Sequence, residues 1–473
     1  MNLRRIFHHR WIVALLLILG GTALGVFAGF GGSWILLAVI AAGALLLVLT
    51  QSPFVGLLAV TFFLPLERIG SYESALGTIR ASQVIALVLL VVWGVRTLAR
   101  RQPARPNPLV FPLLLFSVAG ILGLTQTPNL QRSIAILLLT LFTILVSIAI
   151  PQILTTRKQL DRLVLVLLVS ATLVGVFGLF QFVGDIIGLP TTITGLRDLY
   201  TKEVFGFPRI QSTALEPLYF ANYLLIPLGM LFAFFLAGKG SVPRWLTFLL
   251  FALLTANLIL TVSRGAYLGF AGLLLCIILL ALRDFFRLRT LLPLGIGAVL
   301  VVIVVLRALS FNDATGLNVE TFTSHIQNVF YGASYTERIE TIETAKQAFW
   351  TSPLVGIGSG SFGPYTAPSP VEQPKDGWRI VNNEPLELLA ETGILGLLAL
   401  GIAFSTLIAR SIKALWRCRA DDPLRYILLG LLGALIGVII QYQTFSILYI
   451  MHIWILVGLL VAAQNLVFLG ERQ

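Results

Sequence analysis

The 473-residue sequence is strongly apolar: 57% of its residues are hydrophobic, only 11% are charged, and the mean hydropathy is +0.93. A soluble globular protein carries roughly 25% charged residues, so this composition excludes a soluble enzyme, a disordered chain and a collagen-like chain. The net charge of +12 does not indicate nucleic-acid binding, because the basic residues lie in short loops between apolar runs, where they set membrane orientation. The two cysteines, Cys276 and Cys418, are too few for a disulfide framework and are expected to be free thiols.

Apolar runs recur along the whole chain, so we predict one membrane domain over residues 1–473 that is all-α and polytopic. A membrane-spanning helix needs about 20 predominantly apolar residues. Fourteen candidate spans are present, and because the run between Pro53 and Pro65 is short, we expect about 12–14 transmembrane helices. In chain order the candidates cover 11–30, 33–50, 53–66, 81–98, 108–124, 133–150, 162–184, 216–237, 244–261, 265–282, 290–309, 386–409, 424–442 and 445–469.

The charged residues predict the orientation of these spans. If the first span is an uncleaved helix with a cytoplasmic N-terminus, the inside loops hold 21 of the 33 basic residues but only 5 of the 21 acidic residues. The short basic loops then all lie on one face, as the positive-inside rule requires. Both termini are therefore predicted to be cytoplasmic.

Two long segments, 185–215 and 310–385, are predicted to lie outside. Loops of this length are uncommon in compact domains unless they have a function. In the second, Ser334 and Glu337 form a capping-box pattern that predicts a helix. The apolar face of this helix is predicted to consist of Ile339, Ile342, Ala345 and Phe349.

Three outside arginines are candidate ligand-binding residues: Arg209, Arg264 and Arg338. An arginine at the edge of a span commonly extends toward lipid head groups, which is the alternative for each of them. Arg264 is different because it lies in a turn between two spans that is too short to leave the membrane boundary. A guanidinium there requires a carboxylate, carbonyl or phosphate partner, and its fork of donors suits phosphate oxygens.

A second polar cluster precedes the twelfth span and consists of Asn382, Asn383, Glu384, Glu387 and Glu391. Either asparagine can cap the helix, and the spacing of the glutamates places them on one helix face. One interpretation is an acid-rich helix start that the helix dipole favours. The other is a carboxylate that acts as a general base or pairs with the outside arginines, and the cost of a carboxylate near a span end favours it.

Two further patterns argue against cofactors. The glycines of Gly358–Gly363 match a dinucleotide-binding spacing, but no predicted strand precedes them and Pro364 follows, so we interpret them as a tight turn near the membrane surface. The four histidines have no metal-ligand spacing, so neither a metal nor another cofactor is expected.

Four segments, in this order, resemble the O-antigen ligase and O-antigen polymerase superfamily. The resemblance covers roughly residues 200–400, and its motifs are moderately specific as an ordered set. They are Arg209–Thr213 (RIQST), Thr261–Ala266 (TVSRGA), Arg338 followed by Pro353–Phe362 (PLVGIGSGSF), and Asn383–Gly393 (NEPLELLAETG).

The resemblance implies a metal-independent glycosyltransferase of the bacterial cytoplasmic (inner) membrane, with its active site facing outside. Such enzymes move a glycan from an undecaprenyl-diphosphate carrier to an acceptor hydroxyl, so the implied partners are this donor, a glycan or lipid-anchored acceptor and membrane lipids, not nucleic acid. Carried onto this chain, Arg209, Arg264 and Arg338 would bind the carrier diphosphate. Fixed cations stabilise the charge that develops on such a leaving group. A general base that takes the proton of the acceptor hydroxyl would increase the transfer rate, typically by about 10²–10⁴-fold.

The sequence departs from the ligase pattern at one position. Ligases usually carry a histidine base directly before the asparagine of the last motif, and the matching residue here is Asn382, whose amide takes no proton at neutral pH. Either Glu384, Glu387 or Glu216 replaces this base, with Glu384 first on proximity, or the base is dispensable. The departure favours a polymerase of O-antigen or exopolysaccharide over an O-antigen ligase that transfers glycan to lipid A-core or another acceptor.

The competing class is a transporter or flippase of lipid-linked glycans. Ion-coupled transporters usually bury ionisable groups at mid-membrane. The predicted spans contain almost none, which weighs against coupled transport but does not decide against a flippase.

Overall fold

The computed structural model describes residues 52–69, 71–74, 77–100, 104–238, 243–287, 290–293, 333–374 and 377–470. The spans predicted at 11–30 and 33–50, and most of the one at 290–309, lie outside these residues.

Helices dominate the described residues, and seven of them are long and apolar enough to cross a membrane. The seven are α4 (Ala81–Arg100), α6 (Leu130–Ile153), α7 (Arg157–Ile186), α10 (Pro217–Ala237), α19 (Glu384–Arg417), α20 (Pro423–Gln441) and α21 (Met451–Phe468). Four shorter apolar helices are α3 (Pro53–Phe63), α5 (Val110–Gly123), α11 (Arg244–Leu260) and α12 (Arg264–Leu280). Each coincides with a predicted span, and the predicted all-α, polytopic fold class is confirmed.

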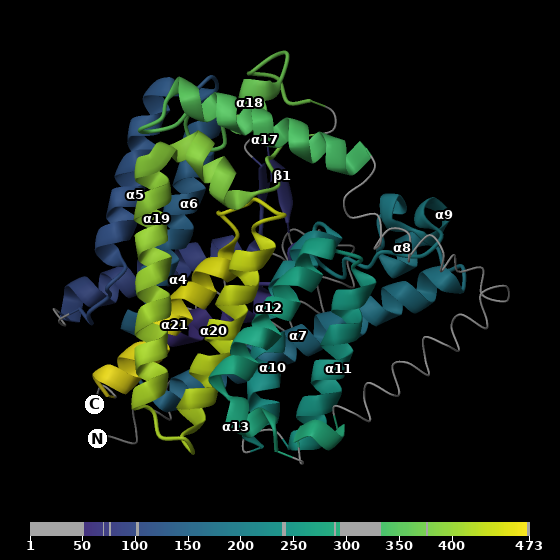
Figure 1. Ribbon diagram of the computed structural model, residues 1–473, viewed down its shortest axis with the longest axis vertical. Coiled ribbons are helices and arrows are strands. Elements are labelled where there is room, and N and C mark those ends of the chain that lie inside the picture. Colours follow the sequence, from purple (N-terminus) through teal and green to yellow (C-terminus); the bar gives the residue numbers. More distant parts are fainter. Residues whose placement is uncertain are drawn as a thin grey trace, which may run out of the picture.

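Short elements connect these helices at the two ends of the bundle. They are the antiparallel hairpin β1 (Tyr72–Ser74) and β2 (Gly77–Ile79), the 3₁₀ helices η1 (Leu124–Gln126) and η2 (Asp198–Tyr200), and the helices α8 (Thr191–Thr194), α9 (Lys202–Phe205), α13 (Leu282–Phe285) and α18 (Phe362–Thr366). A longer helix, α17 (Ala333–Thr351), is not one of the apolar helices. Figure 1 shows α17 and α18 together at one end of the bundle, across the start of α19.

The core is formed by α10, α20 and α21. In an apolar stretch of 18 residues in each of these helices, 94%, 72% and 89% of the stretch is buried, respectively. Small residues bring the helix backbones together, as is common where apolar helices pack in a membrane. A Cβ on Gly229 of α10 would lie 2.5 Å from the carbonyl oxygen of Gly430 of α20. One heptad later, Gly437 of α20 meets Gly269 of α12 in the same way. Helix α20 is therefore clamped between α10 and α12 and fixes their relative position.

The apolar face predicted for α17 could either pack on the spans or lie at the membrane surface. Of this face, Ala345 is buried against α19 together with Ala348, whereas Ile339 is 44% exposed. One local expectation is wrong. The last span was predicted to begin at residue 445, but α21 begins at Met451, and residues 442–450 form a loop without regular structure. The loop lies within a largely apolar stretch of sequence, so hydropathy alone predicts helix there.

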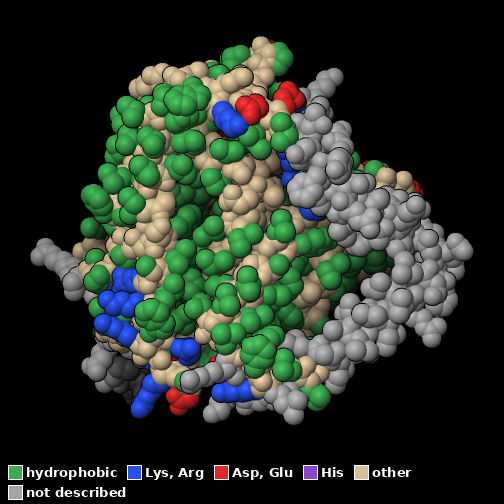
Figure 2. All heavy atoms as spheres, in the orientation of Figure 1, with side chains coloured by type: hydrophobic (Ala, Val, Ile, Leu, Met, Phe, Trp, Pro, Cys, Tyr) green, Lys and Arg blue, Asp and Glu red, His purple; other side chains and the backbone are tan. Residues whose placement is uncertain are grey.

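Most of the lysine and arginine side chains visible in Figure 2 lie at the end of the molecule opposite α17. The ion pair of Arg157 with Asp422, with 2.8 Å between Nη1 and Oδ1, is part of this basic end. Under the positive-inside rule, this end would face the cytoplasm and the α17 end would face outside. The membrane topology stays a prediction, as do the boundaries of the two outer loops.

Candidate functional site

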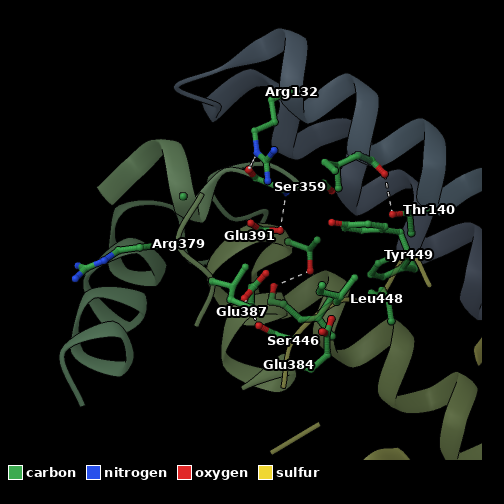
Figure 3. A pocket seen from close by; sticks show the side chains of 18 residues that line it. Arg132, Thr140, Ser359, Arg379, Glu384, Glu387, Glu391, Ser446, Leu448 and Tyr449 are labelled. Carbon is green, nitrogen blue, oxygen red and sulfur yellow. Dashed lines mark hydrogen bonds between the residues drawn. The ribbon is translucent and has the colours of Figure 1, made fainter. Parts of the chain in front are cut away.

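A pocket at the α17 end of the molecule gathers charged side chains from four parts of the chain (Figure 3). Its walls are α6, the glycine-rich turn after α17, the start of α19 and the loop 442–450. It encloses a free volume of about 50 Å³, enough for a few water molecules. The polar side chains that line it include Arg132, Thr140, Ser359, Arg379, Glu384, Glu387, Glu391, Thr392, Ser446 and Tyr449.

The start of α19 is set apart from the rest of that helix by an interruption at Gly393, whose φ is 63° and ψ −168°. This region of backbone space is essentially restricted to glycine. The segment 353–358 runs along the interruption and satisfies the backbone groups that it releases. It accepts hydrogen bonds from the two residues after Gly393 and donates to the carbonyls of Ala390 and Glu391, all at 2.9–3.3 Å. Two of the four motif segments are thus one structural unit.

Glu391 holds the glycine-rich turn. Its carboxylate accepts hydrogen bonds from the backbone N–H groups of Gly360 at 2.6 Å and Phe362 at 3.0 Å. The turn requires left-handed backbone at Gly358 and Gly360, with φ of 98° and 69°. These two N–H groups therefore bind an internal carboxylate, which gives Glu391 a structural role.

Glu387 is also bound by donors of the protein. One of its oxygens accepts the N–H of Val381 at 2.8 Å and a short hydrogen bond from the hydroxyl of Ser446. It therefore connects the start of α19 to the loop 442–450. Its carboxylate still lines the pocket.

Glu384 is the most buried of the three glutamates, at 5% exposure. Its backbone N–H donates to the carbonyl of Tyr442 at 2.8 Å, and its carboxylate interacts with the N–H of Ile447. Asn383 caps the helix at this point, since its side chain accepts the N–H of Leu386 at 3.1 Å. The glutamates thus share one face, as predicted, and Glu384 combines deep burial with a position on the pocket wall.

Arg132 is the cation of this pocket that lies near the glutamates, and it was not among the site residues predicted from the sequence. It lies in the first turn of α6, its Nε donates to the carbonyl of Gly360 at 2.8 Å, and its guanidinium lies 5.3 Å from the ring centroid of Trp378. Figure 3 shows it above Glu391, whereas Arg379 points away from the glutamates. The available signal was the small number of basic residues in the segments predicted to lie outside, because Arg132 is in one of these segments.

Arg209 and Arg264 come together at the junction of α11 and α12. The Nε of Arg209 donates to the carbonyl of Thr261 at 3.4 Å, and its guanidinium lies over the rings of Tyr200 and Phe205. Burial lowers the pKa of Arg209; the charges of Tyr200, Tyr267 and Glu216 oppose this, and the charge of Arg264 adds to it. Arg209 is thus held against the turn between α11 and α12, three residues before Arg264.

The other predicted site residues lie on either side of these groups. Arg338 is on α17, one turn before Thr341, whose hydroxyl donates to the carbonyl of Val381 at 3.3 Å. Arg338 is not among the residues that line the glutamate pocket. Glu216 directly precedes α10; although it lies at the surface, the protein atoms around it raise its pKa by desolvation, and Arg197 and Arg209 oppose this.

The loop 442–450 contacts both halves of the site. Its first residue, Tyr442, accepts the N–H of Glu384. Two residues later, Thr444 packs against Gly265 in the first turn of α12, where a Cβ would collide with the threonine side chain. The loop therefore joins the arginine side of the site to the glutamate side.

Three non-glycine residues in the described part of the chain have a positive φ: Ser212 at 51°, Val262 at 50° and Asn382 at 58°. Each lies within or directly beside a motif segment. Such a conformation costs on the order of 1–3 kcal/mol and tends to be retained at functional sites. For the β-branched Val262 it is a genuine outlier, whereas asparagine is enriched in left-handed backbone.

The described fold is that of a polytopic membrane protein with a polar site at one end of its helices. Residues 249–401, about a third of the chain, match the family model described as O-antigen ligase. The match confirms the predicted resemblance to the O-antigen ligase and polymerase superfamily of membrane glycosyltransferases. It contains Arg264, Arg338 and the three glutamates, but neither Arg209 nor Arg132. No curated protein matches the sequence.

Proposed function

We propose that this protein is a glycosyltransferase that moves a glycan from an undecaprenyl-diphosphate carrier to an acceptor hydroxyl on the outer face of the bacterial cytoplasmic membrane. The family match supports the glycosyltransferase class. The observation that carries the proposal is that Arg209 contacts the turn before Arg264 on one side of the loop 442–450, while the buried Glu384 lies on the other.

The two arginines are suited to bind the leaving group. In the proposed reaction the acceptor oxygen attacks the anomeric carbon, and the bond from that carbon to the diphosphate oxygen breaks. The diphosphate leaves with the bonding electrons, and the fixed charges of Arg209 and Arg264 stabilise it.

Glu384 is suited to accept the proton that the acceptor hydroxyl loses. Glu391 holds the glycine-rich turn and Glu387 holds Ser446, so their oxygens are committed to the protein. Of the three glutamates, Glu384 has the carboxylate that is least committed to hydrogen bonds with the protein, and it is the most buried. It would accept the proton and later release it to water. Asn382 and Asn383 would shape this wall without taking a proton.

A lipid path to this point supports the proposal. An apolar groove of about 290 Å³ runs between α19 and α20 and ends at Glu384. Its floor includes Gly401, where an added Cβ would have no other atom within 4 Å. A prenyl or acyl chain in this groove would bring its polar end to the pocket.

Our first candidate for this reaction is the polymerisation of O-antigen or exopolysaccharide, because Asn382 occupies the position where ligases carry histidine. The ligase activity is the second candidate, and the description of the matched family favours it. A flippase of lipid-linked glycans is the competing class.

The test is reconstitution of the purified protein in vesicles with an undecaprenyl-diphosphate-linked repeat unit. Longer lipid-linked glycans support a polymerase, whereas glycan transfer that appears only when lipid A-core is added supports a ligase. Movement of the donor between leaflets without new glycosidic bonds would contradict both and support a flippase. The Arg264→Ala variant is the negative control.

A further inference from the structure

Arg80, directly before α4, is a buried cation outside the residues discussed above. It is 9% exposed and lies opposite Glu67, which is 5% exposed. The Nε of Arg80 and the Oε1 of Glu67 are 3.8 Å apart, which is an ion pair but too long for a hydrogen bond. Glu67 instead accepts the backbone N–H of Leu215 at 3.2 Å through its other oxygen.

The Nε–H of Arg80 is consequently a buried donor without a hydrogen-bond partner among the described residues. Leaving a buried donor unsatisfied is costly, more so when the donor is charged. Such exceptions in a native structure call for an explanation, and a ligand absent from the free protein is one. A guanidinium offers five donors in a planar fork, which suits the oxygens of a phosphate group.

The position of Arg80 connects it to both halves of the site. The segment that carries Glu67 is bound to the loop before α10: the hydroxyl of Thr213 donates to the carbonyl of Pro65 at 2.6 Å, and Arg68 donates its N–H to the carbonyl of Thr213 at 3.0 Å. This is the loop that begins with Arg209. Arg80 therefore lies next to the anchored end of the arginine motif.

On its other side, Arg80 lies within electrostatic reach of the pocket. Burial raises the pKa of Tyr449, and the charges of Arg132 and Arg80 oppose this, while those of Glu387 and Glu391 add to it. Tyr449 lines the glutamate pocket. Arg80 thus pairs with a residue of the segment that holds the loop of Arg209, and its charge acts on a residue of the pocket wall.

We propose that Arg80 is a further substrate-binding residue, which donates hydrogen bonds to phosphate oxygens of the lipid-linked donor while Glu67 holds it in place. The proposal rests on the proposed function, because it assumes a diphosphate-linked lipid. It predicts a role for the segment before α4, which lies far outside the matched family segment.

The experiment measures binding of undecaprenyl diphosphate to the protein in nanodiscs, with undecaprenol as the probe that lacks phosphate. The variants are Arg80→Gln, Glu67→Gln and the double variant. Arg80→Gln leaves Glu67 as an uncompensated buried charge and is expected to lower the unfolding midpoint, which the double variant should restore. A double Lys346→Gln/Glu343→Gln variant removes an exposed ion pair of α17 and is the matched control.

The proposal expects the stable double variant to bind undecaprenyl diphosphate about ten- to a hundredfold more weakly than wild type, as for the loss of charged hydrogen bonds. Its binding of undecaprenol should be unchanged. If the double variant is stable and binds the diphosphate as wild type does, Arg80 only neutralises Glu67 and the proposal is overturned. If wild type itself binds both probes equally, the diphosphate proposal for the whole site fails, and that of Arg80 fails with it.

Discussion

The carboxylate of Glu391 binds the backbone N–H of Gly360 at 2.6 Å across 31 positions of sequence. The same carboxylate binds the backbone N–H of Phe362. The glycine-rich turn is therefore held to α19 by a side chain two residues before the helix interruption at Gly393. Two motifs that are separate in the sequence form one wall of the site.

We expect Glu391→Gln to act on stability before it acts on chemistry. The amide retains one acceptor oxygen and brings an NH₂ group toward a backbone donor, so the loss should be about 1–3 kcal/mol in the free energy of unfolding. Thermal unfolding of the detergent-solubilised protein, compared with its transfer rate, measures this. A variant as stable as wild type but inactive would contradict the structural role and make Glu391 a candidate for the base.

Gly393→Ala should disrupt the interruption of α19. A Cβ there would collide with the carbonyl of Leu354, and the backbone conformation is one that alanine rarely adopts. The cost should exceed about 2 kcal/mol in unfolding free energy. Gly401→Ala, in the same helix with no atom within 4 Å of its Cβ position, is the control and should change it by less than about 1 kcal/mol. Equal tolerance of both substitutions would mean that the interruption is not required.

Arg264→Lys should impair transfer nearly as much as Arg264→Ala. A lysine keeps the charge but cannot make two parallel hydrogen bonds to phosphate. The measurement is the transfer rate of variants that reach the membrane in equal amounts. Full activity of the lysine variant would return Arg264 to the alternative role of reaching toward lipid head groups.

Glu384→Gln should lower the transfer rate by about 10²-fold or more while donor binding stays nearly unchanged, because it keeps the shape and removes the base. Asn382→His offers the opposite test, since histidine also tolerates the left-handed backbone at this position. If histidine can act as the base here, the double variant should regain activity relative to Glu384→Gln alone. Normal turnover by Glu384→Gln would show that catalysis rests on leaving-group stabilisation.

The orientation has a direct test in a variant that lacks Cys276 and Cys418. A membrane-impermeant thiol reagent added to intact cells should label a cysteine placed at Glu343, on the exposed side of α17. It should not label one placed at Ala420, in the exposed turn between α19 and α20. The reverse pattern would place the site in the cytoplasm and exclude an externally delivered lipid-linked donor.

The sequence predicted the features that depend on local periodicity. The shared face of Glu384, Glu387 and Glu391 follows from their spacing, and the helical core follows from the apolar runs. Their partners could not be predicted, because those contacts join distant segments. Arg132 contacts Gly360 across 228 positions, and nothing in the sequence near either residue indicates the other.

The loop 442–450 and the interruption at Gly393 were missed for a different reason. Both lie within stretches whose composition suits a membrane helix, so hydropathy favours continuous helix there. Tertiary contacts override that preference, since the segment 353–358 satisfies the backbone around Gly393. Polar residues such as Gln443 and Ser446, within an otherwise apolar stretch, were the available signal for the loop.

The central claim is that Arg209 and Arg264 hold a lipid diphosphate while its glycan is transferred. The most direct measurement is a single-turnover transfer assay in vesicles with an undecaprenyl-diphosphate-linked repeat unit, comparing wild type with Arg209→Gln and Arg264→Gln. We expect wild type to form a new glycosidic bond and release undecaprenyl diphosphate, and each variant to lose about 10²-fold or more of this rate, the effect expected when a group that stabilises developing charge is removed. Transfer at the wild-type rate by both variants, or binding of the donor with no new bond in wild type, would contradict the account.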